Sequence, residues 1–226
     1  MKQSVLIVGA GHGLSASLAK LCFSREMSVN LAARDLSKLK SLQLETNAQL
    51  HECDASEIDQ VSHLFKTLDE TTGIPELVVY NPSARVRGPI INLSAKDTLK
   101  ALKVTCFGAF LVAQQAAQRM EKRGSGSIFF TGASAGVKGF PNSSVFAMGK
   151  FGLRGLAQSL ARELHPKNIH IGHFVIDGGI SSRTREPIDD NMLDPDMIAE
   201  AYLQFHEQHR SCWAWELELR PWIEKF

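Results

Sequence analysis

A glycine-rich stretch near the N-terminus has the residue types and the spacing needed to hold a phosphate group. Residues 5–8 are a short apolar run, and leucines recur at helical spacing after residue 13. Between the apolar run and the leucine pattern lie Gly9, Gly11, His12 and Gly13, and Leu14 follows them. In a strand–turn–helix unit, free N–H groups and the helix dipole attract an anion, and glycine lets pyrophosphate approach. The stretch predicts dinucleotide binding, with a plain strand–helix turn as the alternative.

Strands and helices are expected to alternate along the whole chain, and they would position this glycine turn. Strands are expected at residues 28–34, 48–53, 77–80, 127–131 and 169–176, and helices at 35–44, 57–68, 94–122 and 143–164. Such alternation predicts an α/β fold with a doubly wound parallel sheet, the Rossmann arrangement, as a single domain over residues 1–226. Apolar residues alternate in 213–219 before Pro221, which predicts an edge strand with one apolar face.

Composition limits the possible partners. The 226 residues carry 25 Lys plus Arg and 24 Asp plus Glu, so no net charge would recruit nucleic acid or an anionic membrane. The four cysteines are scattered, which favours a reducing compartment. No run approaches the roughly 18 apolar residues of a membrane span, and no signal peptide is visible. We expect a cytoplasmic protein with a small-molecule substrate, and neither nucleic acid nor membrane as a partner.

The glycine turn also carries a family resemblance. It reads Gly9-x-x-x-Gly13-x-Ser15, which resembles the Gly-x-x-x-Gly-x-Gly turn of the short-chain dehydrogenase/reductase family. Ser15 replaces the third glycine, and a small residue there should still allow the helix to pack on the strand. Further landmarks of this family follow the later strands, so that the resemblance covers nearly the whole chain.

The resemblance implies a nicotinamide cofactor. Arg34 follows the second expected strand, where an arginine accommodates the 2′-phosphate of NADP and an acidic residue would favour NAD. NADP is therefore expected over NAD, with His12 as a second phosphate donor; a solvated charge is the alternative for Arg34. The other cofactor positions that the family implies are Asp54 and Ala55 at the adenine, Asn81 and Pro82 after the fourth strand, and Gly178, Ile180 and Ser182 near the nicotinamide. Asp54 could instead, or also, cap the next helix.

The family's catalytic residues are only partly present. The family uses a serine, a Tyr-x-x-x-Lys pair and an asparagine; the matching positions here hold Ala133, Phe146, Lys150 and Thr105. Lys150, which in the family also binds the nicotinamide ribose, is the best remaining proton donor if burial lowers its pKa. Ser134 is a neighbouring hydroxyl that reaches the site only if its loop shifts. Two hypotheses follow: an NADP-dependent oxidoreductase with a displaced proton donor, or a non-catalytic NADP(H)-binding sensor or partner-binding protein.

Two segments are similar to a bacterial subgroup of the family that is usually described only as oxidoreductases. Residues 146–154 match its Phe-Ala-x-Gly-Lys-Phe-x-Leu-Arg pattern, and residues 209–222 resemble its C-terminal pattern. In the family, the helices at 94–122 and 143–164 pair across subunits, and both are rich in small residues here. We therefore expect a homodimer or homotetramer, although small residues would also suit packing on the sheet.

The remaining polar clusters are open to two interpretations. Five histidines, His165, His170, His173, His206 and His209, lack matched carboxylate or cysteine spacing, so we interpret them as surface or helix-end residues and expect no metal. The arginines Arg85, Arg87, Arg183 and Arg185 flank the expected mouth of the site, where they could grip an acidic substrate or simply be solvated. Residues 181–194 read as a mobile loop over the site or as a disordered connector.

Overall fold

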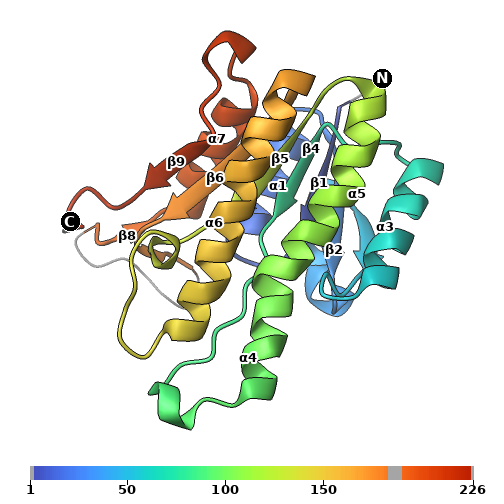
Figure 1. Ribbon diagram of the computed structural model, residues 1–226. Helices are drawn as coiled ribbons and strands as arrows, with labels where there is room; N and C mark the ends of the chain where they lie inside the picture. Colours follow the sequence, from blue (N-terminus) through green and yellow to red (C-terminus); the bar gives the residue numbers. More distant parts are fainter. Residues whose placement is uncertain (1–2, 183–189, 225–226) are drawn as a thin grey trace.

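Seven parallel strands form the central sheet of the computed structural model, which describes residues 3–182 and 190–224. Their order is β3-β2-β1-β4-β5-β6-β9, so the direction of winding reverses between β1 and β4 (Figure 1). The strands are β1 (Ser4–Val8), β2 (Ser28–Ala33), β3 (Gln49–Glu52), β4 (Leu77–Tyr80), β5 (Gly126–Thr131), β6 (Ile169–Ile176) and β9 (Glu216–Leu219). The predicted doubly wound parallel sheet is confirmed.

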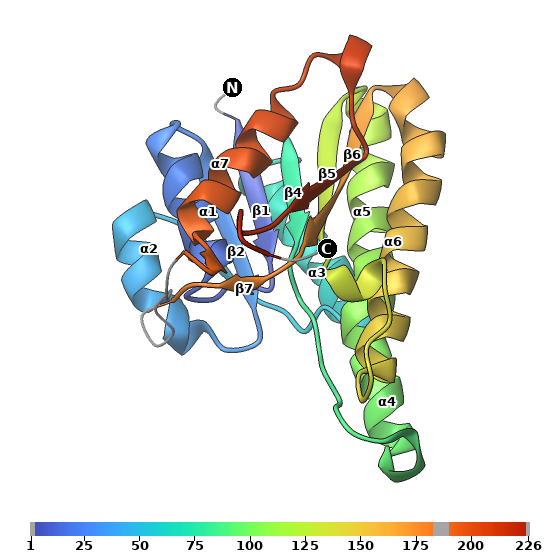
Figure 2. The same cartoon turned by 90° about the vertical axis from the view of Figure 1, so that its left-hand side faces the viewer.

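Helices cover both faces of the sheet, as Figures 1 and 2 show from two directions. One face carries α3 (Ile58–Glu70), α5 (Gly108–Arg123) and α6 (Ser144–Leu164); the other carries α1 (Leu14–Ser24), α2 (Lys40–Thr46) and α7 (Pro195–His206). The helix α4 (Ala95–Leu102) extends the α5 side beyond the sheet. No helix in the described ranges is both long enough and apolar enough to cross a bilayer.

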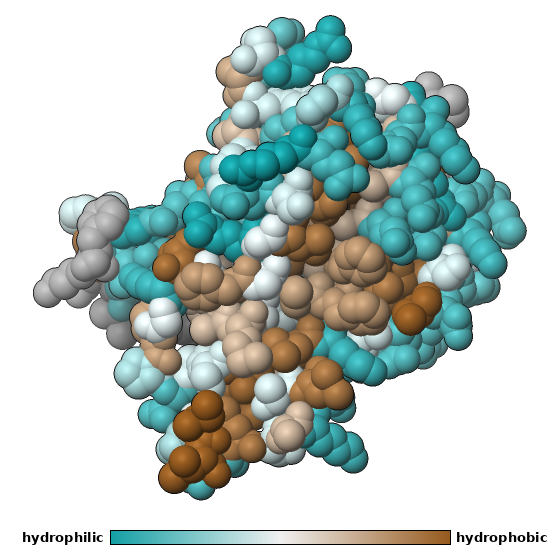
Figure 3. All heavy atoms as spheres, viewed as in Figure 1, coloured by the Kyte–Doolittle hydropathy of each residue, from teal (hydrophilic) through white to brown (hydrophobic). Residues whose placement is uncertain are grey.

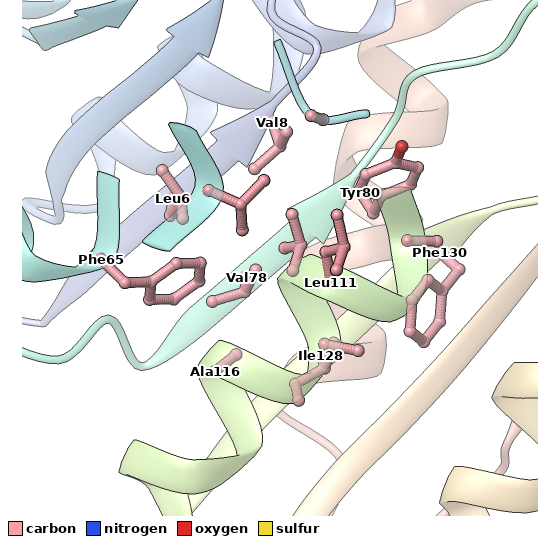
Figure 4. Close-up of a cluster of buried hydrophobic side chains, with 14 of the residues drawn as sticks. Leu6, Val8, Phe65, Val78, Tyr80, Leu111, Ala116, Ile128 and Phe130 are labelled. Carbon is pink, nitrogen blue, oxygen red and sulfur yellow. The ribbon is translucent and has the colours of Figure 1, made fainter. Parts of the chain in front are cut away.

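The core consists of two apolar layers separated by the sheet. Alternate strand residues point to opposite faces, so that Leu6, Val78 and Ile128 contact the α3–α5 layer (Figure 4). Ile7 and Val79 belong to the layer on the α1–α7 face. Both faces of each central strand are buried, which explains why β1 and β4 are continuous apolar runs instead of alternating ones.

Two predicted helices differ from the expectation in their local form. The helix expected at 35–44 begins as a 3₁₀ turn, Leu36–Leu39, whose start is capped by Asp35: its carboxylate accepts a hydrogen bond from the Ser37 N–H at 3.0 Å. The helix expected at 94–122 is continuous, but Lys103–Phe107 between α4 and α5 form a π-helical turn. Tyr80 donates to the Val104 carbonyl at 2.5 Å, giving a backbone oxygen of this wider turn a partner.

The C-terminal prediction was right about the edge position and wrong about the apolar face. The strand β9 lies at the sheet edge beside β6 but begins only at Glu216. Leu217 and Leu219 pack into the α1–α7 layer, whereas Trp215 packs into the opposite layer. Trp213 lies flat on the His170 ring, 4.5 Å between centroids. Because the strand begins only after the two tryptophans, their period-two spacing does not place them on one face.

Candidate active site

A crevice of about 390 Å³ opens at the carboxyl ends of the strands, where the winding reverses. Open α/β sheets bind ligands at this point. The structure brings together at its walls most of the residues predicted to hold a cofactor: Gly9, Gly11, His12, Arg34, Asp54, Ala55, Asn81 and Pro82. The other predicted site residues are not among its lining residues: Gly13, Leu14, Thr105, Ser134, Phe146, Lys150, Gly178, Ile180 and Ser182.

Glycine is required at the first position of the turn for two reasons. Gly9 has a positive φ of +78°, and a Cβ atom there would lie 2.6 Å from the Pro82 ring. At Gly11 and Gly13 a Cβ would meet no protein atom within 4 Å. These two glycines thus border open space at the N-terminus of α1, which begins at Leu14 and has no capping side chain at Gly13. The turn forms a cradle with exposed backbone beside a helix dipole.

Ser15 does more than replace a small glycine. Its hydroxyl donates to the Gly9 carbonyl at 3.2 Å and accepts from the Asn81 side-chain amide at 2.7 Å. The side chain is almost fully buried. Ser15 therefore joins the glycine turn to the end of β4 and positions Asn81 in the crevice wall. The sequence analysis did not predict this role of Ser15. A hydroxyl on the side of a helix that faces a strand is the feature that could have indicated it.

Three side chains that can donate hydrogen bonds to an anion line the crevice. Arg34, His12 and Lys38 all line it, and Lys38 lies 3.3 Å from the Asp35 carboxylate. Lys38 was not predicted; its signal is a second cation four residues after Arg34, in the turn that follows β2. Each of these groups can donate a hydrogen bond to a phosphate.

Asp54 is fixed by a turn and not by the next helix. Its carboxylate accepts from the N–H and the hydroxyl of Ser56, at 3.0 and 2.7 Å. Partial burial raises the pKa of Asp54, but these hydrogen bonds and the nearby charges of Arg34 and Lys100 outweigh burial and lower it. The N-cap of α3 is Glu57, so the predicted capping role of Asp54 is wrong. The ionised carboxylate lies in the crevice wall.

Lys150 is a buried amine beside an apolar ring. Its Nζ donates to the Thr131 carbonyl at 2.6 Å and lies 5.8 Å from the centroid of the Phe146 ring. Burial lowers the pKa of Lys150 to about 7, and the positive charge of Arg85 adds to the effect. The Arg85 guanidinium carbon lies 4.1 Å from the centroid of the same Phe146 ring. An amine that exchanges protons near neutral pH is thus held where the family has its Tyr-x-x-x-Lys pair.

Thr105 serves as an anchor for the loop that follows β4. It is buried in the π-helical turn, and its hydroxyl accepts from the Ala84 N–H at 3.0 Å. A Cβ on Gly149 of α6 would lie 2.9 Å from Thr105, so α6 packs directly on it. Ser134 begins the 3₁₀ turn Ser134–Gly136, where its carbonyl accepts from the Val137 and Lys138 N–H groups. A catalytic role for the Ser134 hydroxyl stays a prediction.

The loop after β6 is tied to the C-terminal segment. Asp177, which stands where the family has proline, is buried and lies 3.3 Å from Arg220 and 3.7 Å from Lys138. Gly178 has a φ of +153°, and a Cβ there would contact Pro221 at 2.7 Å. The next residues form β7 (Gly179–Ile180), which pairs in parallel with β8 (Met192–Leu193). Arg183 and Arg185 and much of the predicted loop lie outside the described residues.

Two of the histidines contradict the surface interpretation. His170 and His173 are fully buried on β6, because this strand is covered on both faces. Burial lowers the pKa of each to about 4. His173 Nδ1 lies 2.9 Å from Glu216, whose carboxylate also accepts two hydrogen bonds from Arg154, at 2.7 and 2.8 Å. Within residues 3–182 and 190–224, no group of three or more His, Cys, Asp or Glu side chains could hold a metal ion.

Comparison with known proteins places this geometry in a family. The sequence model of the short chain dehydrogenase family matches residues 3–192 of this chain. The chain belongs to the short-chain dehydrogenase family. A sepiapterin reductase of Chlorobaculum tepidum is 29% identical over 98% of this chain and 97% of the relative.

Solved structures of this family share the fold. A short-chain dehydrogenase from Rhodopseudomonas palustris superposes with a TM-score of 0.86 and 32% identity, covering 97% of this chain and 99% of that one. A metagenomic short-chain oxidoreductase in complex with NADP superposes with a TM-score of 0.85 and 24% identity, covering 98% of each chain. The fold is therefore shared along nearly the whole chain, and the family to which the chain belongs is one of oxidoreductases.

Proposed function

We propose that this protein is an NADP-dependent oxidoreductase that interconverts a carbonyl compound and its alcohol, with Lys150 as the group that gives and takes the proton. The observation that carries the proposal is the buried Lys150 amine with its pKa near 7, on the helix that in this family bears the catalytic pair. We further place the chain in a divergent branch of the family, because Phe146, Ala133 and Thr105 depart together from the family's pattern.

The crevice has the features that an NADP molecule requires. Gly11 and Gly13 leave room at the helix N-terminus for a pyrophosphate. Arg34, Lys38 and His12 would hold the 2′-phosphate, and Asp54 lies in the wall toward which the adenine is expected. The metagenomic relative in complex with NADP supports this choice of cofactor. The reduced nicotinamide, when bound, supplies the hydride.

Lys150 would supply the proton that the reaction also needs. Reduction of a carbonyl leaves an alkoxide, and a positioned general acid typically contributes about 10²–10⁴-fold to the rate. Phe146 has no proton to give. With a pKa of about 7, Lys150 is present in both its charged and its neutral form near neutral pH, so it can protonate the alkoxide and be reprotonated afterwards. The ammonium form is the acid for reduction, and the neutral amine is the base for oxidation.

We also propose that a second copy of the chain covers the outer face of α4, α5 and α6. A shallow groove of about 680 Å³ on this face is lined by apolar side chains, among them Leu99, Phe107, Phe110 and Met148. These four side chains are partly or largely exposed, and Figure 3 shows apolar surface gathered over this part of the molecule. Pairing through this face supports a homodimer or homotetramer. We retain the cytoplasm as the proposed location, supported by four cysteines that are all free.

A non-catalytic NADP(H)-binding role is the second candidate. It is favoured by the lost catalytic positions: Phe146 and Ala133 carry no exchangeable proton, and the Thr105 hydroxyl is engaged with Ala84. In that case the protein would act as a sensor or would bind a partner according to its nucleotide state. The two functions differ in whether any hydride leaves the bound nucleotide.

Stopped-flow oxidation of NADPH with a panel of aldehydes, ketones and oxo acids tests the proposal. Wild type should turn over some members of the panel, and Lys150→Met should lose most of that rate while still binding NADPH. The Phe146→Tyr/Ala133→Ser double variant serves as the comparison. If turnover appears only in this double variant, the native protein is a binder and the proposed proton donor is wrong.

A further inference from the structure

A cavity of about 330 Å³ lies at the end of the sheet opposite to the crevice. Its walls come from the 3₁₀ turn His165–Lys167, between α6 and β6, and from the 3₁₀ turn Arg210–Cys212, before β9 (Figure 2). Both turns precede parallel strands, so this cavity is at the amino ends of the strands, whereas the crevice is at their carboxyl ends. The eight residues of β6 span about 26 Å. The two cavities are therefore separate.

Arg210 brings a positive charge to this cavity. The side chain is exposed and lines the cavity, and within the described residues it makes no ion pair or hydrogen bond. The acid nearest to it in sequence, Glu207, lies 3.8 Å from Arg25 instead. No described residue that lines the cavity is Asp or Glu. A guanidinium has five N–H donors, and its edge matches the geometry of a carboxylate or a phosphate.

His165 supplies a further hydrogen-bond donor. Its Nε2 accepts from the Ile171 N–H at 3.1 Å, the shorter of two contacts between this nitrogen and the Ile171 backbone. Burial lowers the pKa of His165, so the ring is neutral at pH 7 and its proton lies on Nδ1. Across residues 3–182 and 190–224, Nδ1 has no hydrogen-bond partner, and it is not a buried atom. A molecule in the cavity can therefore accept a hydrogen bond from it.

Trp213 forms an apolar wall whose position is fixed by its neighbours. Its ring lies flat on the buried His170 ring, and its centroid is 5.3 Å from that of His165. The indole N–H donates to the Gln208 carbonyl at 2.9 Å. The volume of about 330 Å³ is at the lower end of the range for small-molecule sites, about 300–1,000 Å³. The cavity thus has room for carbon atoms besides an anionic group.

We propose that this cavity is a second ligand site, which binds a small organic molecule through its phosphate or carboxylate group. The oxyanion binds at Arg210 and His165, and the carbon part lies against Trp213. Arginine binds both kinds of oxyanion through two parallel N–H donors, so the two groups share one chemistry. The inference is independent of the proposed function, because it uses no residue that lines the crevice.

Alkylation of Cys212 by uncharged iodoacetamide monitors this cavity, because Cys212 is exposed and lines it. Peptide mass analysis distinguishes Cys212 from the other three cysteines. The probes are phenyl phosphate and benzoate, at up to about 10 mM so that even a millimolar site is filled, with uncharged benzamide as the matched control. At least one anion should protect Cys212 at a concentration tenfold or more below that of benzamide. The stronger of the two identifies the anionic group that the site prefers.

Matched arginine variants decide whether Arg210 is responsible. Arg210→Met should raise the concentration needed for half protection at least tenfold. Arg162→Met removes the same charge from an exposed position on α6 that does not line the cavity, and it should leave the protection unchanged. The proposal is overturned if neither anion protects Cys212 better than benzamide, or if the protection survives in Arg210→Met.

Saturating NADPH separates this site from the crevice. Protection of Cys212 should persist with the nucleotide present, at the same half-protecting concentration. Loss of the protection under NADPH would mean that the anion acts from the crevice, and the second site would fall. Protection that depends on Arg210, in a protein that binds no nicotinamide nucleotide, would leave the second site standing and remove the proposed function.

Discussion

The two ends of the active-site region have diverged to very different degrees. At the crevice beside β1 and β2, the backbone requirements of the family turn are met: Gly9 packs on Pro82, and Gly11 and Gly13 border open space. At the catalytic end, Lys150 remains while its tyrosine partner is Phe146. The cofactor end is thus built largely by backbone shape and the catalytic end by individual side-chain groups.

This contrast teaches which changes a shared fold can absorb. Ser15 replaces a glycine at the crevice and adds hydrogen bonds to Gly9 and Asn81 without obstructing the turn. Loss of a hydroxyl at residue 146 removes a proton outright, and it can be compensated only by another titratable group nearby. Lys150, at a pKa of about 7, is such a group.

Replacement of Lys150 by methionine should reduce the reaction rate at the catalytic end far more than it reduces nucleotide binding at the cofactor end. Without an acid, NADPH-dependent reduction should slow by about 10²–10⁴-fold, while the affinity for NADPH should change far less. The same change should stabilise the fold at pH 7, because a buried amine with a depressed pKa disfavours folding. Single-turnover kinetics and urea unfolding measure the two effects. Equal losses of binding and of rate would mean that Lys150 holds the cofactor and does not act as the acid.

The pH dependence of the reaction rate should reflect the protonation state of Lys150. Reduction needs the ammonium form, so kcat/KM should fall about tenfold per pH unit above a pKa near 7, and oxidation of the alcohol should rise up to that pH and then level off. Burial lowers this pKa from that of free lysine, so the turning point lies well below pH 10. A profile that is flat from pH 6 to 9 would contradict proton transfer by Lys150.

Acid should destabilise the fold through the buried His170 and His173 on β6. Each has a pKa of about 4 in the folded protein because of burial. The unfolded chain binds more protons between that pH and about 6.5, so stability is complete above pH 6.5 and is lost as the pH falls toward 4. His170→Phe should reduce this pH-dependent loss by on the order of 2 kcal/mol. His63→Phe, at an exposed site, is the control in the same unfolding series and should leave the slope unchanged.

The smallest effect is expected at Ser15. Ser15→Ala removes the link between the Gly9 carbonyl and the Asn81 amide, so the free energy of unfolding should drop by about 1–2 kcal/mol. Affinity for NADPH should fall by less than tenfold, because the glycines themselves are unchanged. Thermal unfolding and nucleotide titration on the same samples check both values. A drop in affinity with no change in stability would instead place the Ser15 hydroxyl in direct contact with the nucleotide.

The sequence predicted the structure correctly wherever hydrophobic periodicity and backbone conformation determine it. The sixth expected strand, 169–176, matches β6 residue for residue, since the run is buried on both faces. The crevice residues from Gly9 to Pro82 converge because the carboxyl ends of parallel strands share one edge. Those positions depend on the parallel arrangement of the strands, which the alternating pattern predicts.

Contacts between side chains from distant segments could not be predicted in the same way. The pairing of Arg85 with Phe146 joins a loop to helix α6, 61 residues apart in the chain, and no periodicity encodes it. The burial of His170 and His173 depends on β9 and α7 covering β6. The tryptophans have a strand-like spacing but lie before β9, so the pattern alone misplaced them.

The central claim is that a nucleotide occupies the Gly9–Gly13 crevice with its 2′-phosphate at Arg34. Calorimetric titration of NADPH and NADH against wild type, Arg34→Ala and Lys40→Ala tests it most directly, with Lys40 as a nearby cation that is not among the residues lining the crevice. We predict that wild type and Lys40→Ala prefer NADPH by at least about tenfold, and that Arg34→Ala loses most of this preference. Equal affinity of wild type for the two nucleotides, or no affinity for either, would contradict the account.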